Sequence, residues 1–583
     1  MSWLRPLIAT GLLLCTMPAQ SAEERSKLTM DSGRPLTPEQ QAVEFDHADL
    51  RFRVIPDDKR LEGDATLTFL ARSPVSRLVV DLDQQLAIGR IEIDGDVLPA
   101  SAWRNPEGQL SIDLPRTLAA GESVRTRIVY AGQPREAKRA PWDGAFVWSK
   151  APSGEPWIAT SVQGEGCDLF WPCIDHPTGE PKVVEQHITV PAPLVAAGNG
   201  VLVGMQESDG WRTWHWKARS PNTYAVALNI GPYEELKGEY RSRFGNTIPL
   251  HFWHLKGREA QARGLFEEFP LALDFFEQTI GPYPFADEKM GVVETPHLGM
   301  EHQTINAYGN DYVKDEYGYD WLLHHEFAHE WFGNQLTNAD WDEMWLHEGF
   351  GTYVQPLYLQ WLRGDMEYLA NLLKMRPGIA NRFPVVSGKS QVVEQAYDDK
   401  TGPGQDLYLK GAWILHALRG LIGDEAFFTS VRRLVYGRDD PAPGNFQPRL
   451  AITREYIDIV NDVTDRDYTW FFDVYVYRAA LPELVAERRG NVLALRWKTP
   501  DDLPFPLPVD IRIGGLDGRV VTVPMTAGQG SVELPPGMHY TLDPHSKLLR
   551  HLPHIEAYRV DAKARAEAKA KAKAEAEKAS GEE

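Results

Sequence analysis

The sequence contains few cysteines, no excess of basic charge and no long apolar run outside its first residues. Its 3 cysteines allow at most one disulfide in 583 residues. The formal net charge of −21 argues against nucleic acid as a partner, because an acidic surface repels a phosphate backbone. No glycine-rich phosphate loop is present either. The composition, 43% apolar and 25% charged, is typical of a soluble globular chain of several domains.

The N-terminus has the pattern of a secretory signal. Residues 1–22, MSWLRPLIATGLLLCTMPAQSA, carry one arginine, an apolar core from Pro6 to Cys15 and then small residues, with a cleavage site near Ser21 or Ala22. The apolar core is too short to span a bilayer, which needs about 20 residues. We therefore expect export, to the periplasm or the medium. The alternative is a buried N-terminal helix.

Cleavage of this signal would remove Cys15 and leave Cys167 and Cys173. Two cysteines in an exported chain can close a small loop as a disulfide. Two unpaired buried thiols are the alternative, since the sequence does not show whether their Cα atoms approach within about 7 Å.

Hydrophobic periodicity divides the chain into successive β and α regions. Period-two runs such as ATLTFLA, RLVVDLD and WRTWHWK predict an antiparallel β domain over residues 37–240. A mostly α domain is predicted over 241–482. Its first helix has an apolar stripe at Phe266, Phe269, Leu273, Phe276 and Ile280. Its other helical patterns lie at 320–332, 343–363, 405–421 and 450–479.

The C-terminal part returns to short β runs. VLALRW and RVVTVPM predict a small β-sandwich over residues 487–552. Residues 553–583 are rich in alanine, lysine and glutamate and have no apolar face, so we expect a solvated tail. The predicted fold class is therefore multidomain α+β.

The stretch Leu322–Thr337, LLHHEFAHEWFGNQLT, contains an H-E-x-x-H motif on one predicted helix. His325 and His329 lie four residues apart and share a face, where two imidazoles can bind one zinc ion. Glu326 projects beside the metal, where a general base for the bound water is needed. His324 lies off this face, so we interpret it as a supporting residue.

The ends of this helix and the segment after it support a metal site. Asp320 can cap the helix, and Gly333 with Asn334 can end it. Glu348 follows His329 with 18 residues between them, on a second predicted helix. Two histidines and one glutamate leave a fourth position open for water, which is the arrangement of catalytic zinc. The alternative for Glu348 is an exposed helix carboxylate.

These motifs resemble those of the zinc aminopeptidases of the aminopeptidase N family, which are gluzincin metallopeptidases. HEFAHEWFGNQLT, the spacer and WLHEGF carry the closest likeness. HLGMEHQT (297–304) resembles the exopeptidase motif of the family, and QGEGCDLFWPCIDHP (163–177) resembles a segment that binds the substrate amine. LYLKGAWIL (407–415) resembles the segment around the catalytic tyrosine. The matches follow the family order from about residue 40 to residue 480.

The resemblance implies a thermolysin-like catalytic domain with one Zn²⁺ per chain, held by His325, His329 and Glu348. It implies that Glu326 is the general base and that Tyr408 stabilises the oxyanion together with zinc. Taken alone, a helical tyrosine is most often a core residue. The implied substrate is a peptide with a free N-terminus.

The resemblance also implies a set of substrate-binding residues. Two crowded carboxylates suit the α-ammonium group, because a cation between them relieves their repulsion. Backbone groups of the exopeptidase motif would line the cleft, and an ordinary turn role is the alternative for the glutamine. The set comprises Gln163, Glu165, Gly299, Met300 and Glu301.

Two departures from the family pattern bear on the expected activity. His302 stands where the motif has asparagine. The chain also lacks the C-terminal helical domain of the longer members, so we expect a short three-domain form with a more open cleft. The leading prediction is a zinc aminopeptidase. The alternatives are a thermolysin-type zinc endopeptidase and a non-catalytic peptide-binding protein on the same scaffold.

Overall fold

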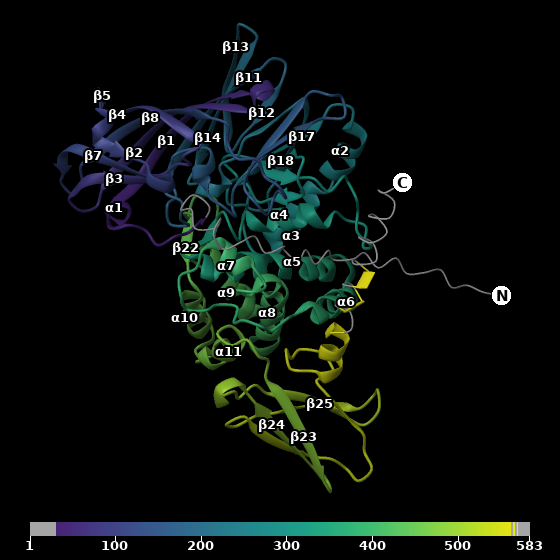
Figure 1. The fold of residues 1–583 in the computed structure, drawn as a ribbon. Helices are drawn as coiled ribbons and strands as arrows, with labels where there is room; N and C mark the ends of the chain where they lie inside the picture. The colour runs from purple at the N-terminus through teal and green to yellow at the C-terminus, as the bar shows by residue number, and fades with distance from the viewer. Residues whose placement is uncertain (1–30, 561–563, 566–567, 570–583) are drawn as a thin grey trace.

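A computed structural model describes residues 31–560, 564–565 and 568–569. The predicted signal segment and most of the predicted tail lie outside the described residues. A β-rich N-terminal part, a helical middle part and a small C-terminal β part follow one another along the molecule (Figure 1). This arrangement confirms the predicted multidomain α+β fold class. Among the described residues, no helix has the length and apolarity needed to cross a bilayer.

The N-terminal part is built on an eight-stranded sheet in which strand β1 is central. Strand β2 alternates buried and half-buried positions along its whole length, as the period-two runs predict. Strand β1 pairs antiparallel with β2 on one side and parallel with β11 on the other. The strands, in spatial order, are β13 (Val201–Ser208), β14 (Trp211–Arg219), β11 (Val183–Pro191), β1 (Val43–Ile55), β2 (Arg60–Ala71), β8 (Ser123–Gly132), β4 (Leu86–Ile93) and β5 (Asp96–Val97).

Two smaller sheets complete the N-terminal part. One contains β3 (Val75–Asp81), β7 (Gln109–Leu118) and β6 (Trp103–Arg104). The other contains β12 (Val195–Ala197), β15 (Asn229–Gly231), β10 (Pro156–Ser161) and β9 (Ala145–Lys150). After β10 the chain enters a buried loop in which Cys167 and Cys173 form a disulfide, with their Cα atoms 6.3 Å apart.

The middle part opens with a five-stranded sheet, which the prediction of a mostly α domain over 241–482 did not include. Strand β18 is buried at all five positions, so it shows no alternation that sequence could reveal. Parallel pairing of β18 with its two neighbours explains this burial. The strands in order are β16 (Tyr233–Arg241), β17 (Thr247–Leu255), β18 (Met290–Glu294), β20 (Asn306–Tyr308) and β19 (Gly299–Met300).

Eleven α-helices are found among the described residues with assigned bounds, and all but the first lie in the middle part. The two central ones, α5 and α8, pack tightly because Gly349 and Gly411 face each other: a Cβ on Gly411 would lie 2.8 Å from Gly349 Cα. The helices are α1 (Pro38–Gln41), α2 (Glu259–Phe266), α3 (Phe269–Thr279), α4 (Trp321–His329), α5 (Trp345–Arg363), α6 (Asp365–Met375), α7 (Val393–Tyr397), α8 (Leu409–Ile422), α9 (Asp424–Tyr436), α10 (Thr453–Thr464) and α11 (Thr469–Tyr475).

The predicted apolar stripe falls on two helices instead of one. Phe266 ends α2, and Phe269 begins α3 with Pro270 at its second position. Proline lacks the backbone N–H that an uninterrupted helix would need, so a new helix starts there. Ile280 caps α3, as the following GPYPF segment predicts.

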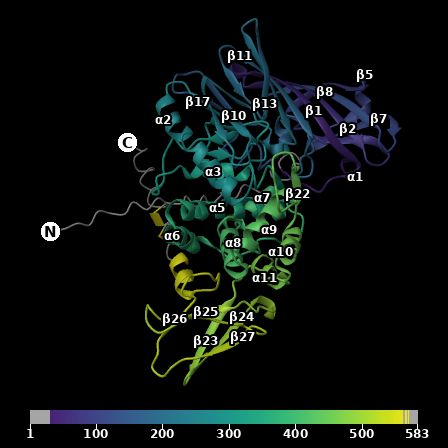
Figure 2. The same cartoon turned by 180° about the vertical axis from the view of Figure 1, so that it is seen from behind.

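The C-terminal part consists of two facing three-stranded sheets, seen at the opposite end of the molecule from β13 (Figure 2). Short strands with alternating burial, such as β24 and β25, supply its core. The sheets contain β23 (Glu483–Arg489), β24 (Val492–Lys498) and β27 (Gln529–Glu533), and β26 (Arg519–Val523), β25 (Val509–Ile513) and β28 (Tyr540–Leu542). A two-stranded ribbon of β21 (Leu336–Asn338) and β22 (Arg449–Ala451) lies in the middle part.

Candidate metal centre

Helix α4 carries the two histidines of the H-E-x-x-H motif. The Asp320 side chain accepts hydrogen bonds from the Leu322 and Leu323 amides, so the N-terminal cap is as predicted. The regular helix ends at His329, four residues before Gly333. A turn continues from there and closes with a bond from the Asn334 amide to the His329 carbonyl, as at many helix C-termini.

The two helices α4 and α5 bring His325, His329 and Glu348 together. His325 Nε2 and His329 Nε2 lie 3.3 Å apart. Glu348 Oε2 lies 3.7 Å from His325 Nε2 and 3.5 Å from His329 Nε2. Ligands about 2.0 Å from a tetrahedral zinc ion are separated by about 3.3 Å, so the three atoms have the spacing of a zinc site.

The protonation of these side chains also fits a metal ion. His329 Nδ1 lies 2.8 Å from the Phe332 carbonyl, to which it can only donate, so Nε2 is the ring nitrogen that faces the centre. Burial is outweighed by contact with Glu348, which raises the pKa of His329 to about 10, so without a metal ion Nε2 holds a proton that a bound cation would replace. Burial, followed by the charge of His329, lowers the pKa of His325 to about 4, which leaves this imidazole neutral. Glu348 Oε2 is buried and has no hydrogen-bond partner among the described residues. Three converging ligand atoms need a cation between them.

The other oxygen of Glu348 is held by two tyrosines. Tyr397 donates its hydroxyl to Glu348 Oε1 over 2.5 Å, and Tyr408 donates to the same atom over 2.8 Å. Burial and the nearby Glu348 carboxylate raise the pKa of Tyr408 well above its usual value, so its hydroxyl stays protonated. Tyr408 thus lies at the centre, as predicted from its motif. Tyr397 had no sequence signal.

Glu326 lies next to the edge strand β19. A Cβ on Gly299 would lie only 2.4 Å from Glu326 Oε1, so glycine is needed at this position to admit the carboxylate. The side chain of Glu326 is 6% exposed. Burial, and then the negative charge of Glu301, raise the pKa of Glu326. Met300 follows in β19, which pairs with β20 on one side only.

Glu301 is the second carboxylate at the centre. Its Oε1 accepts hydrogen bonds from Gln163 Nε2 over 2.6 Å and from the Tyr224 hydroxyl over 2.7 Å. Burial is the main cause that raises the pKa of Glu301 above its usual value, and the negative charge of Glu348 also raises this pKa. The structure therefore joins Gln163 to Glu301 across 138 residues of sequence. Tyr224 is a site residue that sequence reasoning missed, because no motif marks it.

Glu165 lies on the same loop as Gln163, two residues further along. Burial, followed by the charge of Asp143, raises the pKa of Glu165 to about 8. No hydrogen bond or ion pair links its side chain to Glu301. A half-buried carboxyl with a raised pKa is nevertheless ready to receive a cation, since a positive charge would restore its ionised form.

A buried network holds the loop that carries Glu301. Glu330 accepts hydrogen bonds from the Thr304 amide over 2.9 Å and from Asn306 Nδ2 over 2.8 Å. Asn334 Nδ2 donates to the Glu301 carbonyl over 3.0 Å. Glu330, which follows His329 in the chain, is thus a supporting residue. His302, the departure from the family motif, is fully buried, and neither of its ring nitrogens has a hydrogen-bond partner among the described residues.

The remaining histidines of the motif region are structural. His324 stacks on Tyr358 with ring centroids 3.9 Å apart and meets the edge of Tyr319. Burial lowers the pKa of His324 to about 3. His347 accepts a hydrogen bond from the Asn338 amide at Nε2 over 3.0 Å, so it turns away from the ligands.

Comparison with known proteins agrees with this geometry. Residues 272–474 match the peptidase family M1 domain. An M1 zinc metallopeptidase mutant from Deinococcus radiodurans, solved with a Tyr-Ser-Ala substrate, is 27% identical with a TM-score of 0.65. The alignment covers 77% of this chain and 98% of that one.

Two curated aminopeptidases resemble parts of the chain. Leucyl aminopeptidase of Saccharolobus solfataricus is 24% identical over 46% of this chain and 35% of its own length. Aminopeptidase N of Haemonchus contortus is 26% identical over 47% of this chain and 30% of its own length. This chain therefore spans about a third of the length of these relatives. The domain match over residues 272–474, the solved structures and the histidine–glutamate triad agree, and all three are similar to what is found in the M1 zinc metallopeptidases.

Proposed function

We propose that this protein is a zinc-dependent aminopeptidase that hydrolyses the N-terminal bond of peptides. The observation that carries the proposal is the placement of a second buried carboxylate, Glu301, beside the base Glu326 and the triad. An endopeptidase has no use for such a group. An exopeptidase needs it to bind a free α-ammonium.

His325, His329 and Glu348 would hold the zinc ion. When bound, it supplies a Lewis acid that polarises the scissile carbonyl and makes a water molecule acidic near neutral pH. Their helices are fixed by the Asp320 cap and by the glycine contact between α5 and α8, so the ligands are set before the metal arrives.

The chain's own residues perform the proton transfers. The Glu326 carboxylate accepts a proton from the attacking water, whose oxygen bonds to the scissile carbonyl carbon. When the carbon–nitrogen bond breaks, Glu326 returns the proton to the leaving amine nitrogen. The Tyr408 hydroxyl donates a hydrogen bond to the carbonyl oxygen as that oxygen acquires negative charge. For this step Tyr408 leaves Glu348, which keeps its bond from Tyr397.

The substrate N-terminus would be fixed by Glu301, Glu165 and Gln163. Gln163 donates an Nε2 proton to Glu301, so its carbonyl oxygen remains able to accept from the ammonium. Strand β19 is the edge of its sheet, and its unpaired side offers the Gly299 and Met300 backbone to an extended peptide. An amine anchor beside the metal centre would restrict cleavage to the N-terminal bond, as an exopeptidase requires.

The decisive experiment compares a peptide with its N-acetylated twin, with and without chelator. We expect cleavage of the free peptide only, loss of cleavage after zinc removal and recovery on adding zinc back. Equal rates for both peptides would favour the thermolysin-type endopeptidase and refute the proposal.

Glu326→Gln tests the base directly. We expect this variant to retain its zinc and lose about 10²–10⁴-fold in kcat, the usual contribution of general base catalysis. Glu277→Gln is the matched control, because Glu277 is also a buried carboxylate but bonds Ser242, away from the triad. Undiminished turnover of the Glu326 variant would refute the assigned base. Loss of turnover with zinc retained would exclude the non-catalytic peptide-binding protein.

Export remains part of the proposal. The Cys167–Cys173 disulfide supports it, since disulfides persist in oxidising compartments. Sequencing the N-terminus of the protein recovered from the periplasm or medium should find cleavage near Ser21 or Ala22. Retention of the full N-terminus in the cytosol would contradict export.

A further inference from the structure

A second cluster of histidine and carboxylate side chains lies on one face of the N-terminal sheet. His187 of β11 and His215 of β14 are direct cross-strand partners in the antiparallel pair. Glu185 is two residues before His187, so it projects from the same face. The alternate residues of β11, such as Val184 and Ile188, are buried on the other face.

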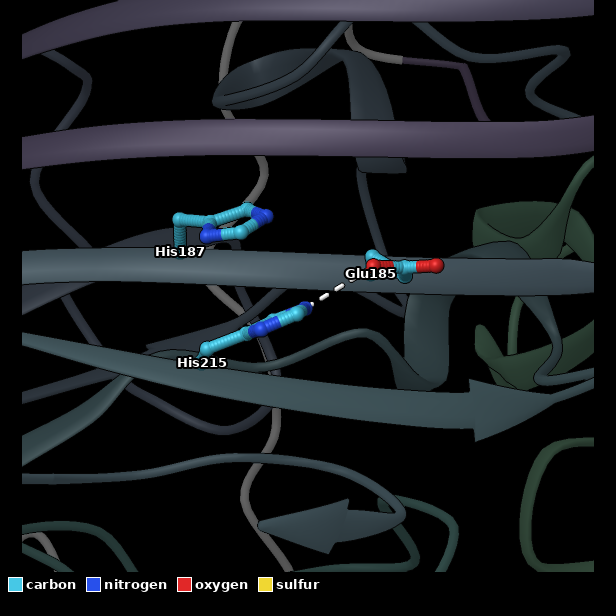
Figure 3. Close-up of side chains that lie close together, drawn as sticks. All are labelled: Glu185, His187 and His215. Carbon is cyan, nitrogen blue, oxygen red and sulfur yellow. Dashed lines mark hydrogen bonds and ion pairs between the residues drawn. The ribbon is translucent and has the colours of Figure 1, made fainter. Parts of the chain in front are cut away.

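The three side chains converge on one point. One ligand atom from each of Glu185, His187 and His215 lies within 4.8 Å of the others. His215 Nε2 is 2.8 Å from Glu185 Oε2, and the two imidazoles stack with centroids 4.0 Å apart. Figure 3 shows the rings one above the other, with the contact from His215 to Glu185.

The ion pairs of this face leave the His187 imidazole without a hydrogen-bond partner among the described residues. Glu185 bonds His215, and its other oxygen lies 3.3 Å from Lys217 Nζ and 3.5 Å from His47 Nε2. His187 Nε2 reaches only to 3.5 Å from Asp49 Oδ1. That oxygen is itself buried and has no hydrogen-bond partner among the described residues. Two imidazoles beside two carboxylates therefore present more acceptor atoms than the sheet satisfies.

We propose that Glu185, His187 and His215 bind a second divalent transition-metal ion, separate from the catalytic centre. Two imidazoles and one carboxylate suit Zn²⁺ or Cu²⁺, whereas Ca²⁺ and Mg²⁺ prefer all-oxygen ligands. The side chains are partly exposed, which leaves the remaining coordination positions to water. Binding turns the two rings out of their stack so that both lone pairs face the ion, and Lys217, which is half exposed, moves off Glu185.

Such an ion would connect β11 to β14 near the edge of the eight-stranded sheet. Only β13 lies beyond β14 in this sheet. An ion that binds the folded sheet and not the unfolded chain stabilises this edge by mass action. The site uses no residue of the proposed catalytic machinery, so its loss should leave peptide hydrolysis unchanged.

Zinc content measured by equilibrium dialysis at pH 7.5 tests the proposal on the full-length protein. At a free zinc concentration that saturates the wild type, we expect two zinc ions per chain. The double variant His187→Asn, His215→Asn should bind one and keep full peptidase activity. The reciprocal variant His325→Ala, Glu348→Ala should also bind one and lose activity.

His251→Asn is the matched control. His251 Nδ1 lies 2.6 Å from Glu235 Oε1 on a neighbouring sheet, with exposure similar to the His215–Glu185 pair but no second histidine opposite. The His251→Asn variant should therefore bind two zinc ions per chain. In the reciprocal variant, copper replacing zinc should give an electron paramagnetic resonance signal split by two nitrogens, and this signal should disappear when His187→Asn and His215→Asn are added. Calcium should not compete.

Three results would overturn the proposal. The first is one zinc ion per saturated wild-type chain. The second is a double variant that still binds two zinc ions per chain and whose thermal unfolding matches that of the wild type, so that it is correctly folded. The third is loss of the second ion in His251→Asn as well, which would show that zinc associates unspecifically with surface histidines.

Discussion

Replacing Tyr397 with phenylalanine separates zinc binding from catalysis. The hydroxyl of Tyr397 donates to Glu348 Oε1 over 2.5 Å, and Tyr408 donates to the same oxygen. A hydrogen bond to a charged group contributes about 1.5–3 kcal/mol. Because Tyr408 still satisfies the oxygen in the variant, we expect the lower part of this range. That corresponds to a loss of about 10-fold in zinc affinity, within the 10–100-fold usual for partners of metal ligands.

Zinc affinity is measured by competition with a fluorescent chelator, and kcat is then measured at saturating zinc. Tyr397→Phe should bind zinc more weakly and recover a kcat within a few-fold of the wild type. Tyr408→Phe should lose about 10²-fold or more in kcat at any zinc concentration, because it removes the donor to the carbonyl oxygen. The double variant should bind zinc far more weakly than the single effects add up to, since Glu348 Oε1 would then be buried without a partner.

Tyr475→Phe is the control for removing a buried hydroxyl, since that hydroxyl has no hydrogen-bond partner among the described residues. It should leave zinc affinity and kcat unchanged. The reasoning would be refuted by wild-type zinc affinity in Tyr397→Phe. A kcat loss in this variant equal to that of Tyr408→Phe at saturating zinc would instead show that Tyr397 acts on the substrate.

Two glycine substitutions test other contacts of the site. Gly299→Ala places a Cβ 2.4 Å from Glu326 Oε1, so we expect about 10²-fold lower kcat with zinc content unchanged. A wild-type kcat in this variant would contradict the close fit of Glu326 against β19. Gly411→Ala forces α8 away from Gly349 on α5 and should cost about 1–3 kcal/mol in urea unfolding. Gly420→Ala on the same helix meets its nearest atom at 3.4 Å and should not destabilise; equal losses in both variants would contradict the close-packing argument.

The candidate metal centre was predictable from the sequence where its geometry is local. A spacing of four residues within a helix places His325 and His329 on one face, so their proximity follows from helical geometry alone. The contacts around Glu301, in contrast, join segments that are far apart in the sequence. Gln163 and Tyr224 reach it from 138 and 77 residues away, through loops whose course no periodicity predicts. The family motif led to Gln163, and Tyr224 had no motif to reveal it.

Secondary structure was also predictable only where the sequence pattern reflects local burial. Strands with one face in solvent, such as β2, alternate visibly and were predicted. Strand β18 is buried on both faces and loses its alternation, so the sheet that opens the middle part was missed. The end of the helix was predicted only to within a few residues. The helical pattern runs to residue 332, whereas α4 ends at His329, and Gly333 and Asn334 close the turn that follows it.

The two histidine–glutamate clusters differ in how their ligands are brought together, and this explains why only one was visible in the sequence. In α4 the spacing of four is fixed by the helix itself. In the sheet, His187 faces His215 only because β11 and β14 pair in one register, and a slip of one residue would turn either side chain to the buried face. Buried neighbours such as Ile188 and Trp216 hold that register. The core of the N-terminal domain therefore positions the proposed second metal site, and an isolated peptide spanning β11 to β14 should not bind zinc.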